Sequence, residues 1–148
     1  MRILLQRVSR AEVRVDGVVV GAIGGGLVAL IGIGPDDDEG MADALATRCA
    51  ELRIFRDAEG RTNHSLVDVR GAVLVVSQFT LYADTRRGRR PGFTGAADPV
   101  LAARLYERFA ARLSSLGVPV ATGTFGAKME VELVNDGPMT IWIDSGDR

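Results

Sequence analysis

Histidine and cysteine are almost missing from this sequence. Its 148 residues include one of each, His64 and Cys49. A single cysteine excludes an intrachain disulfide and suits a reducing compartment. Zinc sites built from cysteine and histidine need three or four such ligands, so we expect no metal and no cofactor. His64 has no partner in the neighbouring sequence, which favours a surface or hydrogen-bonding role over catalysis.

Long hydrophobic runs are also absent. The longest apolar stretch, residues 23–33, contains four glycines and is too short to cross a bilayer. Gln6 and Arg7 interrupt the N-terminal apolar residues before a signal-peptide core can form. We therefore expect a cytoplasmic protein with no membrane contact. The net charge of −1 excludes a strongly basic domain, so we expect no DNA binding and only local contact with RNA.

The residues that are present have the composition of an ordinary globular protein, and we expect residues 1–148 to form one domain. Apolar and β-branched residues predict several strands. These cover residues 1–8 and 11–20 around Ser9-Arg10 and an Asp16-Gly17 turn, residues 27–31, residues 73–76, and two segments around 131–133 and 141–143.

Two helices are predicted between the strands. Acidic residues 36–39 precede apolar positions at helical spacing in residues 41–52. The second helix begins at Asp98-Pro99 and reaches about Leu116, with Gly117 suited to its C-terminal cap. The order of elements predicts an α/β fold, with mixed β-sheets and helices packed on them.

Polar residues directly follow the apolar strand at 73–76. Ser77, Gln78, Phe79 and Thr80 stand where backbone N–H groups and short hydroxyls can be held at the mouth of a pocket and stabilise an oxyanion. The alternative is that Ser77 and Thr80 only satisfy backbone groups at the strand end, and the sequence alone favours that alternative.

Two further segments have a functional and a structural interpretation. Residues 135–138, Asn-Asp-Gly-Pro, are typical of a turn, where the carbonyls beside Gly137 and Pro138 could approach a ligand. The local sequence alone favours a trans Gly-Pro peptide. Arg86, Arg87, Arg89 and Arg90 form a basic stretch that suits RNA phosphates or a solvated surface loop. The glycines at 24–26 lack the spacing of a phosphate-binding motif and are interpreted as a loop.

Taken together, Ser77-Gln78-Phe79-Thr80-Leu81 and Asn135-Asp136-Gly137-Pro138-Met139-Thr140 resemble the two signature motifs of the D-aminoacyl-tRNA deacylases. The resemblance covers nearly the whole chain and includes residues 6–11, 83–91 and 116–127. It implies the fold of that family and a homodimeric enzyme. Such an enzyme hydrolyses the ester between the 3′ end of tRNA and a D-amino acid, or glycine mischarged on tRNA(Ala), and rejects L-aminoacyl-tRNA in translation proofreading.

The resemblance also implies residue roles. The peptide matching Gly137–Pro138 is cis in the family and enters the active site of the other subunit, where its carbonyls hold the substrate amino group. Arg7 matches the residue that braces this motif, and Phe79 and Met129 would flank the terminal adenosine. Met139 replaces the valine of many relatives, which is a tolerable change of volume.

By the same resemblance, Ser77 to Thr80 surround the ester carbonyl. Thr80 lacks a neighbouring base, and an unactivated hydroxyl is a weak nucleophile. We therefore expect water to attack with the help of the terminal 2′-hydroxyl of the tRNA, and the amides of Phe79 and Thr80 to form an oxyanion hole. Two rivals share this pocket: a non-catalytic module that binds an RNA end or a nucleotide, and an esterase for small esters with Thr80 as nucleophile.

Overall fold

The two longest strands set the frame of the fold. In the computed structural model, which describes residues 1–147, β1 (Arg2–Val15) pairs along its length with β8 (Glu130–Asp144). The predicted Asp16-Gly17 turn, with φ of 50° and 77°, returns the chain into β2 (Val18–Ile23). The predicted interruption at Ser9-Arg10 is wrong, because β1 continues through both exposed residues: Arg10 pairs with Val134 of β8, and Ser9 lies at a register shift between Val8 and Arg10.

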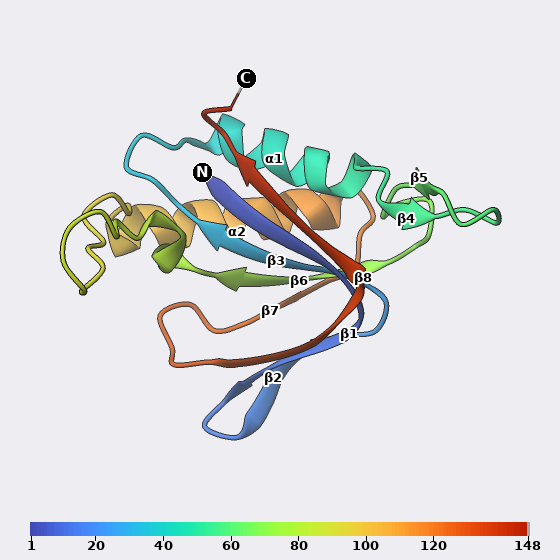
Figure 1. The fold of residues 1–148 in the computed structure, drawn as a ribbon, viewed down its shortest axis with the longest axis horizontal. Helices are drawn as coiled ribbons and strands as arrows, with labels where there is room; N and C mark the ends of the chain where they lie inside the picture. Colours follow the sequence, from blue (N-terminus) through green and yellow to red (C-terminus); the bar gives the residue numbers. More distant parts are fainter. Residues whose placement is uncertain (148) are drawn as a thin grey trace.

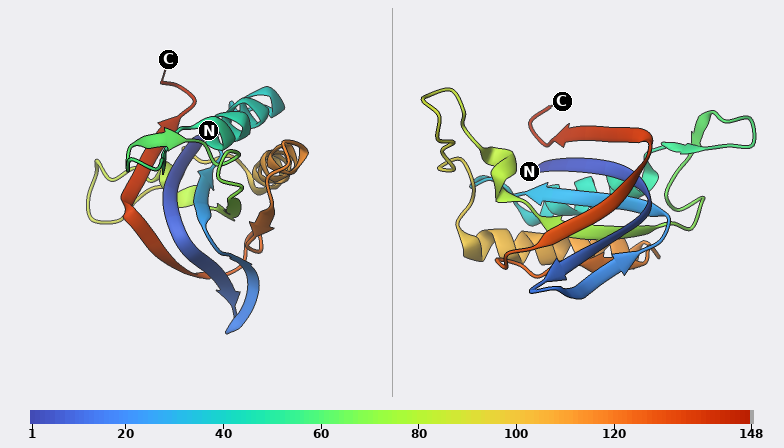
Figure 2. Two further views of the ribbon diagram at one scale, coloured as in Figure 1. Left: turned by 90° about the vertical axis from the view of Figure 1, so that its right-hand side faces the viewer. Right: turned by 60° about the horizontal axis from the view of Figure 1, so that its bottom comes forward.

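Six strands form one mixed sheet. Its order is β2-β1-β3-β6-β7, and β8 pairs with β1 outside this path. β3 (Gly26–Gly32) runs antiparallel to β1 and parallel to β6 (Ala72–Ser77), which in turn runs parallel to β7 (Val120–Thr122). A Cβ added to Gly21 of β2 would lie 2.4 Å from the carbonyl oxygen of Thr122 in β7. The two ends of the order therefore meet, and the sheet curls into a nearly closed barrel (Figure 2).

Two helices lie side by side along one face of this sheet (Figure 1). Asp38 caps α1 (Glu39–Glu51) and Asp98 caps α2 (Pro99–Ser115), with Pro99 in the first turn as predicted. The main core fills the space between helices and sheet, and it includes Cys49 and Phe109. This arrangement confirms the predicted α/β fold.

The predicted buried strands lie at the centre of the sheet, and all of Leu27, Val28, Ala29 and residues 73–76 are buried. A small hairpin of β4 (Phe55–Arg56) and β5 (Thr62–His64) stands apart from the main sheet, and it contains His64. Gly24 and Gly25 form the predicted connection, and Gly26 begins β3.

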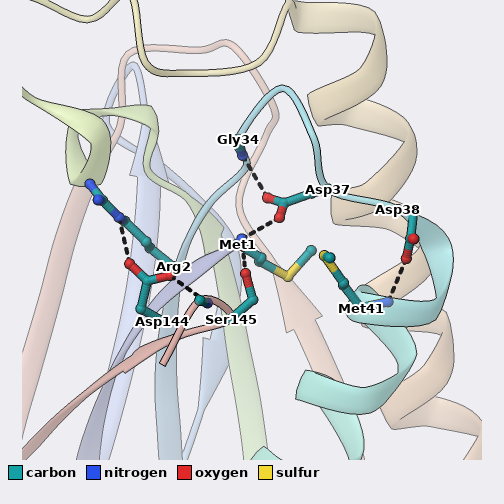
Figure 3. Close-up of polar contacts among 9 residues, drawn as sticks. Met1, Arg2, Gly34, Asp37, Asp38, Met41, Asp144 and Ser145 are labelled. Carbon is teal, nitrogen blue, oxygen red and sulfur yellow. Dashed lines mark hydrogen bonds and ion pairs between the residues drawn. The ribbon is translucent and has the colours of Figure 1, made fainter. Parts of the chain in front are cut away.

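The ends of β1, β3 and β8 are tied together beside a short 3-10 helix, η1 (Phe79–Tyr82). The terminal nitrogen of Met1 donates to Ser145 Oγ at 2.6 Å and to the carboxylate of Asp37 (Figure 3). Arg2 Nε donates to Asp144 Oδ2 at 2.9 Å, and Arg2 Nη1 donates to the carbonyl of Leu81 in η1 at 3.0 Å. The polar network therefore fixes η1 against the first strand.

Within residues 1–147, no helix is both long and apolar enough to cross a membrane. In the same part of the chain, no three side chains of histidine, cysteine, aspartate or glutamate are grouped in a way that could hold a metal ion.

Candidate functional site

A pocket of about 580 Å³ opens where β6 ends and α2 begins. Its walls come from four segments that are distant in the sequence. They are the ends of β3 and β6, the approach to α2, and the chain between β7 and β8: Ile31, Ile33, residues 76–79, Phe93, Ala96, Ala97, Pro99, Ala102, residues 125–127, Met129 and Val131. A mostly apolar cavity with a few polar groups at one edge is typical of a small-molecule or cofactor site.

Three of the four predicted strand-end residues, Ser77, Gln78 and Phe79, line one edge of this pocket. Ser77 and Gln78 are its polar members, and the backbone N–H of Gln78 donates to the carbonyl of Ile31 at 2.7 Å. Phe79 and Thr80 are the first two residues of η1, so their own amides have no acceptor inside that helix. The first turn of η1 therefore leaves these two N–H groups without an intrahelical acceptor.

Thr80 itself lies at the rim, exposed and outside the pocket lining. Gln78 Nε2 donates to Thr80 Oγ1, which occupies an acceptor position of the hydroxyl without removing its proton. The phenol of Tyr82 in the same helix is no substitute for a base, because burial and the carboxylate of Asp37 raise the pKa of Tyr82 to about 12. His64 lies on β5, away from the pocket lining. No general base is therefore placed at Thr80 among the described residues.

An aromatic pair stands at the pocket entrance. Phe79 is 55% exposed, and its ring lies edge-on to Phe93 with 5.0 Å between centroids. Phe125 and Met129 also line the pocket. Flat apolar surfaces of this kind can hold a planar ring. Phe79 and Met129 were predicted at this site, whereas Phe93 and Phe125 were not, although each follows a turn-rich segment that could have drawn attention.

The arginine loop, residues 85–92, connects η1 to α2 beside this entrance. Its base is closed by two backbone hydrogen bonds between Asp84 and Gly92, of 2.8 and 2.9 Å. Arg86 makes a bidentate ion pair with Asp84, and its guanidinium holds the pKa of that carboxyl well below the ordinary value. Arg87, Arg89 and Arg90 are exposed, and no carboxylate among residues 1–147 lies within ion-pair distance of them.

The second predicted segment is a bulge inside β8 and not a turn between two strands. Gln6 pairs with Thr140 and Val8 with Asn135, so the four residues 136–139, here called the bulge, stand opposite Arg7 alone. The Gly137–Pro138 peptide is cis, as the family resemblance implies and unlike the trans peptide expected from the local sequence alone. Both residues are exposed and neither lines the pocket of the same chain. Bulges re-aim the backbone near functional sites.

Arg7 is 3% exposed and lies under the bulge. Its Nε donates to the carbonyl of Asp136 at 3.0 Å, and its Nη1 donates to the carbonyl of Ile54. The carboxylate of Asp136 is 3.6 Å from Nε. A charged group buried at this level is costly without such partners. The guanidinium therefore links the bulge to the chain before the β4–β5 hairpin.

Comparison with known proteins gives consistent results. A family model described as D-Tyr-tRNA(Tyr) deacylase matches residues 4–144. The D-aminoacyl-tRNA deacylase of Ruegeria pomeroyi is 60% identical over 97% of this chain and 99% of its own length. That of Roseiflexus castenholzii is 61% identical over 98% of this chain and 92% of its own length.

Solved structures share the fold. The c-Myc DNA Unwinding Element Binding Protein is 36% identical, with a TM-score of 0.92 over 98% of this chain and 99% of that one. A probable eukaryotic D-amino acid tRNA deacylase is 21% identical, with a TM-score of 0.82 over 96% and 97% of the two chains, a likeness of fold alone.

Proposed function

The chain belongs to the D-Tyr-tRNA(Tyr) deacylase family and acts as a hydrolase of D-aminoacyl-tRNA, and from this premise we propose how its residues perform the reaction. The terminal adenosine enters the pocket between Phe79 and Met129, and the ester carbonyl lies against Ser77 to Thr80. The observation that carries this proposal is that η1 begins at the polar edge of an apolar pocket, so that the amides of its first two residues, Phe79 and Thr80, have no acceptor inside the helix.

Ester hydrolysis needs a nucleophile and a place for the negative charge of the tetrahedral intermediate. The amides of Phe79 and Thr80 supply the second, as preorganised donors that need no reorganisation during the reaction. Since no base accompanies Thr80, water attacks the carbonyl carbon, and the 2′-hydroxyl of the terminal ribose assists the proton transfer. The products are the free D-amino acid and tRNA. Glycine on tRNA(Ala) is a second substrate, because it has no side chain to reject.

Chiral selection falls to the bulge of a second copy of the chain. The pocket contains no residue of its own bulge, and the bulge projects with Gly137 and Pro138 exposed. We propose that the main-chain oxygens of this bulge enter the pocket of the other subunit and hold the substrate amino group. An L side chain then collides with the bulge, so rejection is the sorting device.

The outer face of β1 and β8 fits a two-fold interface. Facing pairs run from Gln6–Thr140, beside the bulge, through Leu4–Trp142 to Arg2–Asp144, beside η1. Trp142 is 46% exposed at the middle of this face. In a two-fold dimer one patch meets itself, so an axis near Trp142 brings the bulge of one subunit to η1 of the other. The bulge and the pocket rim are separated by about 13 Å of strand, which two subunits can bridge.

The arginine loop is proposed to bind the phosphates before the terminal adenosine. Arg87, Arg89 and Arg90 are free to do so, whereas Arg86 is held by Asp84. Guanidinium groups bind phosphate oxygens in pairs and give salt-dependent affinity. We also propose that residues 1–148 act as one domain and in the cytoplasm, where tRNA is charged.

The test is deacylation of matched substrates by the purified protein. We expect it to remove D-Tyr and Gly from tRNA and to leave L-Tyr-tRNA intact. Absence of D-Tyr release at micromolar enzyme, with the RNA still bound, would favour the non-catalytic module. One relative is named for binding a DNA unwinding element. Adding DNA as a competitor tests whether this chain binds DNA too, and we expect no competition.

A further inference from the structure

Asn135 stands at the base of the bulge, and its side chain makes three hydrogen bonds. Its Nδ2 donates to the carbonyl of Arg7 on β1 at 2.9 Å and to the carbonyl of Met139 at 2.9 Å. The first bond ties the bulge to the neighbouring strand. The second joins the residue before the bulge to its last residue, so the side chain closes the bulge across its base.

The acceptor side of the same amide is also used. Thr140 Oγ1 donates to Asn135 Oδ1 at 3.3 Å, and Gln6 Nε2 donates to Thr140 Oγ1 at 3.2 Å. The amide orientation follows from these partners, because Nδ2 faces two carbonyls and only a donor fits there. Aspartate has the same shape but no donor, so it would place a carboxylate against two carbonyl oxygens.

We propose that Asn135 is a positioning residue for chiral selection, and that its amide fixes the direction of the carbonyls of the bulge. Arg7 holds the bulge from beneath through the carbonyl of Asp136, and the side chain of Asn135 ties its last residue, Met139, to the carbonyl of Arg7 on β1. Neither contact touches the substrate. This inference rests on the proposed role of the bulge. Its effect can be large, because a misplacement of about 1 Å in a positioning group can reduce rates a hundredfold.

The experiment compares Asn135→Asp and Asn135→Ala with the parent protein, by deacylation of D-Tyr-tRNA and L-Tyr-tRNA. Asn63→Asp is the matched control. Asn63 on β5 accepts from the guanidinium of Arg53 and also hydrogen-bonds to Asp57, so this change too places a carboxylate against an acceptor, but outside the pocket lining and the bulge. We expect Asn135→Asp to lower the ratio of D to L rates by about tenfold to a hundredfold, and Asn135→Ala to lower it less. Asn63→Asp should keep the parent ratio.

Thermal unfolding and RNA binding of each variant separate positioning from folding. A folded Asn135→Asp protein that binds tRNA normally and loses chiral discrimination supports the inference. A folded Asn135→Asp protein with the parent ratio overturns it. If the parent itself does not distinguish the two substrates, the proposed role of the bulge fails first, and that result is seen without any variant.

Discussion

Gly137→Ala is the change that the geometry of the bulge opposes most strongly. Gly137 has φ of +133°, a region that L side chains rarely adopt, and an added Cβ would lie 2.7 Å from Arg7 Nη2. Arg7 cannot move aside easily, because it is buried and donates to the carbonyls of Asp136 and Ile54. The substitution therefore combines backbone strain with the displacement of a buried charged donor.

Backbone strain costs of order 1–3 kcal/mol, and a weakened hydrogen bond from a charged group costs about as much, so we expect a loss of roughly 3 kcal/mol in the free energy of unfolding. For a domain of this size, that lowers the melting temperature by about 6–12 °C. Since the carbonyls of the bulge also move, the rate on D-Tyr-tRNA should fall in the fraction that remains folded. Thermal unfolding and single-turnover deacylation measure the two effects.

Gly60→Ala is the control for this prediction. Gly60 also has positive φ, +78°, but nothing lies within 4 Å of an added Cβ. The Gly60→Ala variant should lose about 1–2 kcal/mol in the free energy of unfolding, from backbone strain alone, and should deacylate D-Tyr-tRNA at the parent rate. If Gly137→Ala melts no lower than Gly60→Ala and deacylates D-Tyr-tRNA at the parent rate, the argument about Arg7 and the bulge is refuted.

Three other predictions follow from the site. Thr80→Ala should keep turnover within about tenfold of the parent, because its hydroxyl has no base; a trapped aminoacyl-enzyme in the parent would contradict this. Alanine at Arg89 and Arg90 should weaken tRNA binding. The slope of log affinity against log salt concentration should fall by about one for each phosphate that is no longer bound, and Arg86→Ala should change it less. Equal effects of these variants in a salt titration would count against the assignment. Burial raises the pKa of Cys49 to about 12, so a thiol reagent at pH 8 should react with it only after unfolding; rapid labelling of the native protein would oppose this.

The local features of the fold could be predicted from the sequence. Asp98-Pro99 and Gly117 mark the ends of α2 because capping depends on a few neighbouring residues. The strands at 27–31 and 73–76 are continuous apolar runs, and the structure buries them at the centre of the sheet. These predictions needed no knowledge of distant contacts.

Features set by distant contacts could not be predicted in the same way. Ser9-Arg10 looks like a break in a strand, yet pairing with β8, more than a hundred residues away, resumes at Arg10 after a register shift at Ser9, and β1 continues. Residues 135–138 have the composition of a turn, and only the register against Gln6 and Val8 shows that residues 136–139 form a bulge.

The composition of the pocket also depends on distant contacts and could not be predicted from local sequence. Phe93 and Phe125 line it because the ends of several strands and the start of α2 meet there, and no local pattern indicates that meeting. Arg7 was assigned to the bulge through a family resemblance, since its own sequence context is that of a surface arginine. The structure buries it and shows its hydrogen bond to Asp136.

The central claim is that each active site combines the pocket of one subunit with the bulge of the other. Mixing two impaired variants tests it directly: Phe79→Ala, which removes the ring at the pocket entrance, and Gly137→Ala, which distorts the bulge. After unfolding and joint refolding in equal amounts, statistical mixing gives roughly a quarter of all sites an intact pocket and an intact bulge. We predict that D-Tyr-tRNA deacylation recovers to about that fraction of the parent rate. Mixed dimers that form and remain as inactive as the two variants alone would contradict the claim.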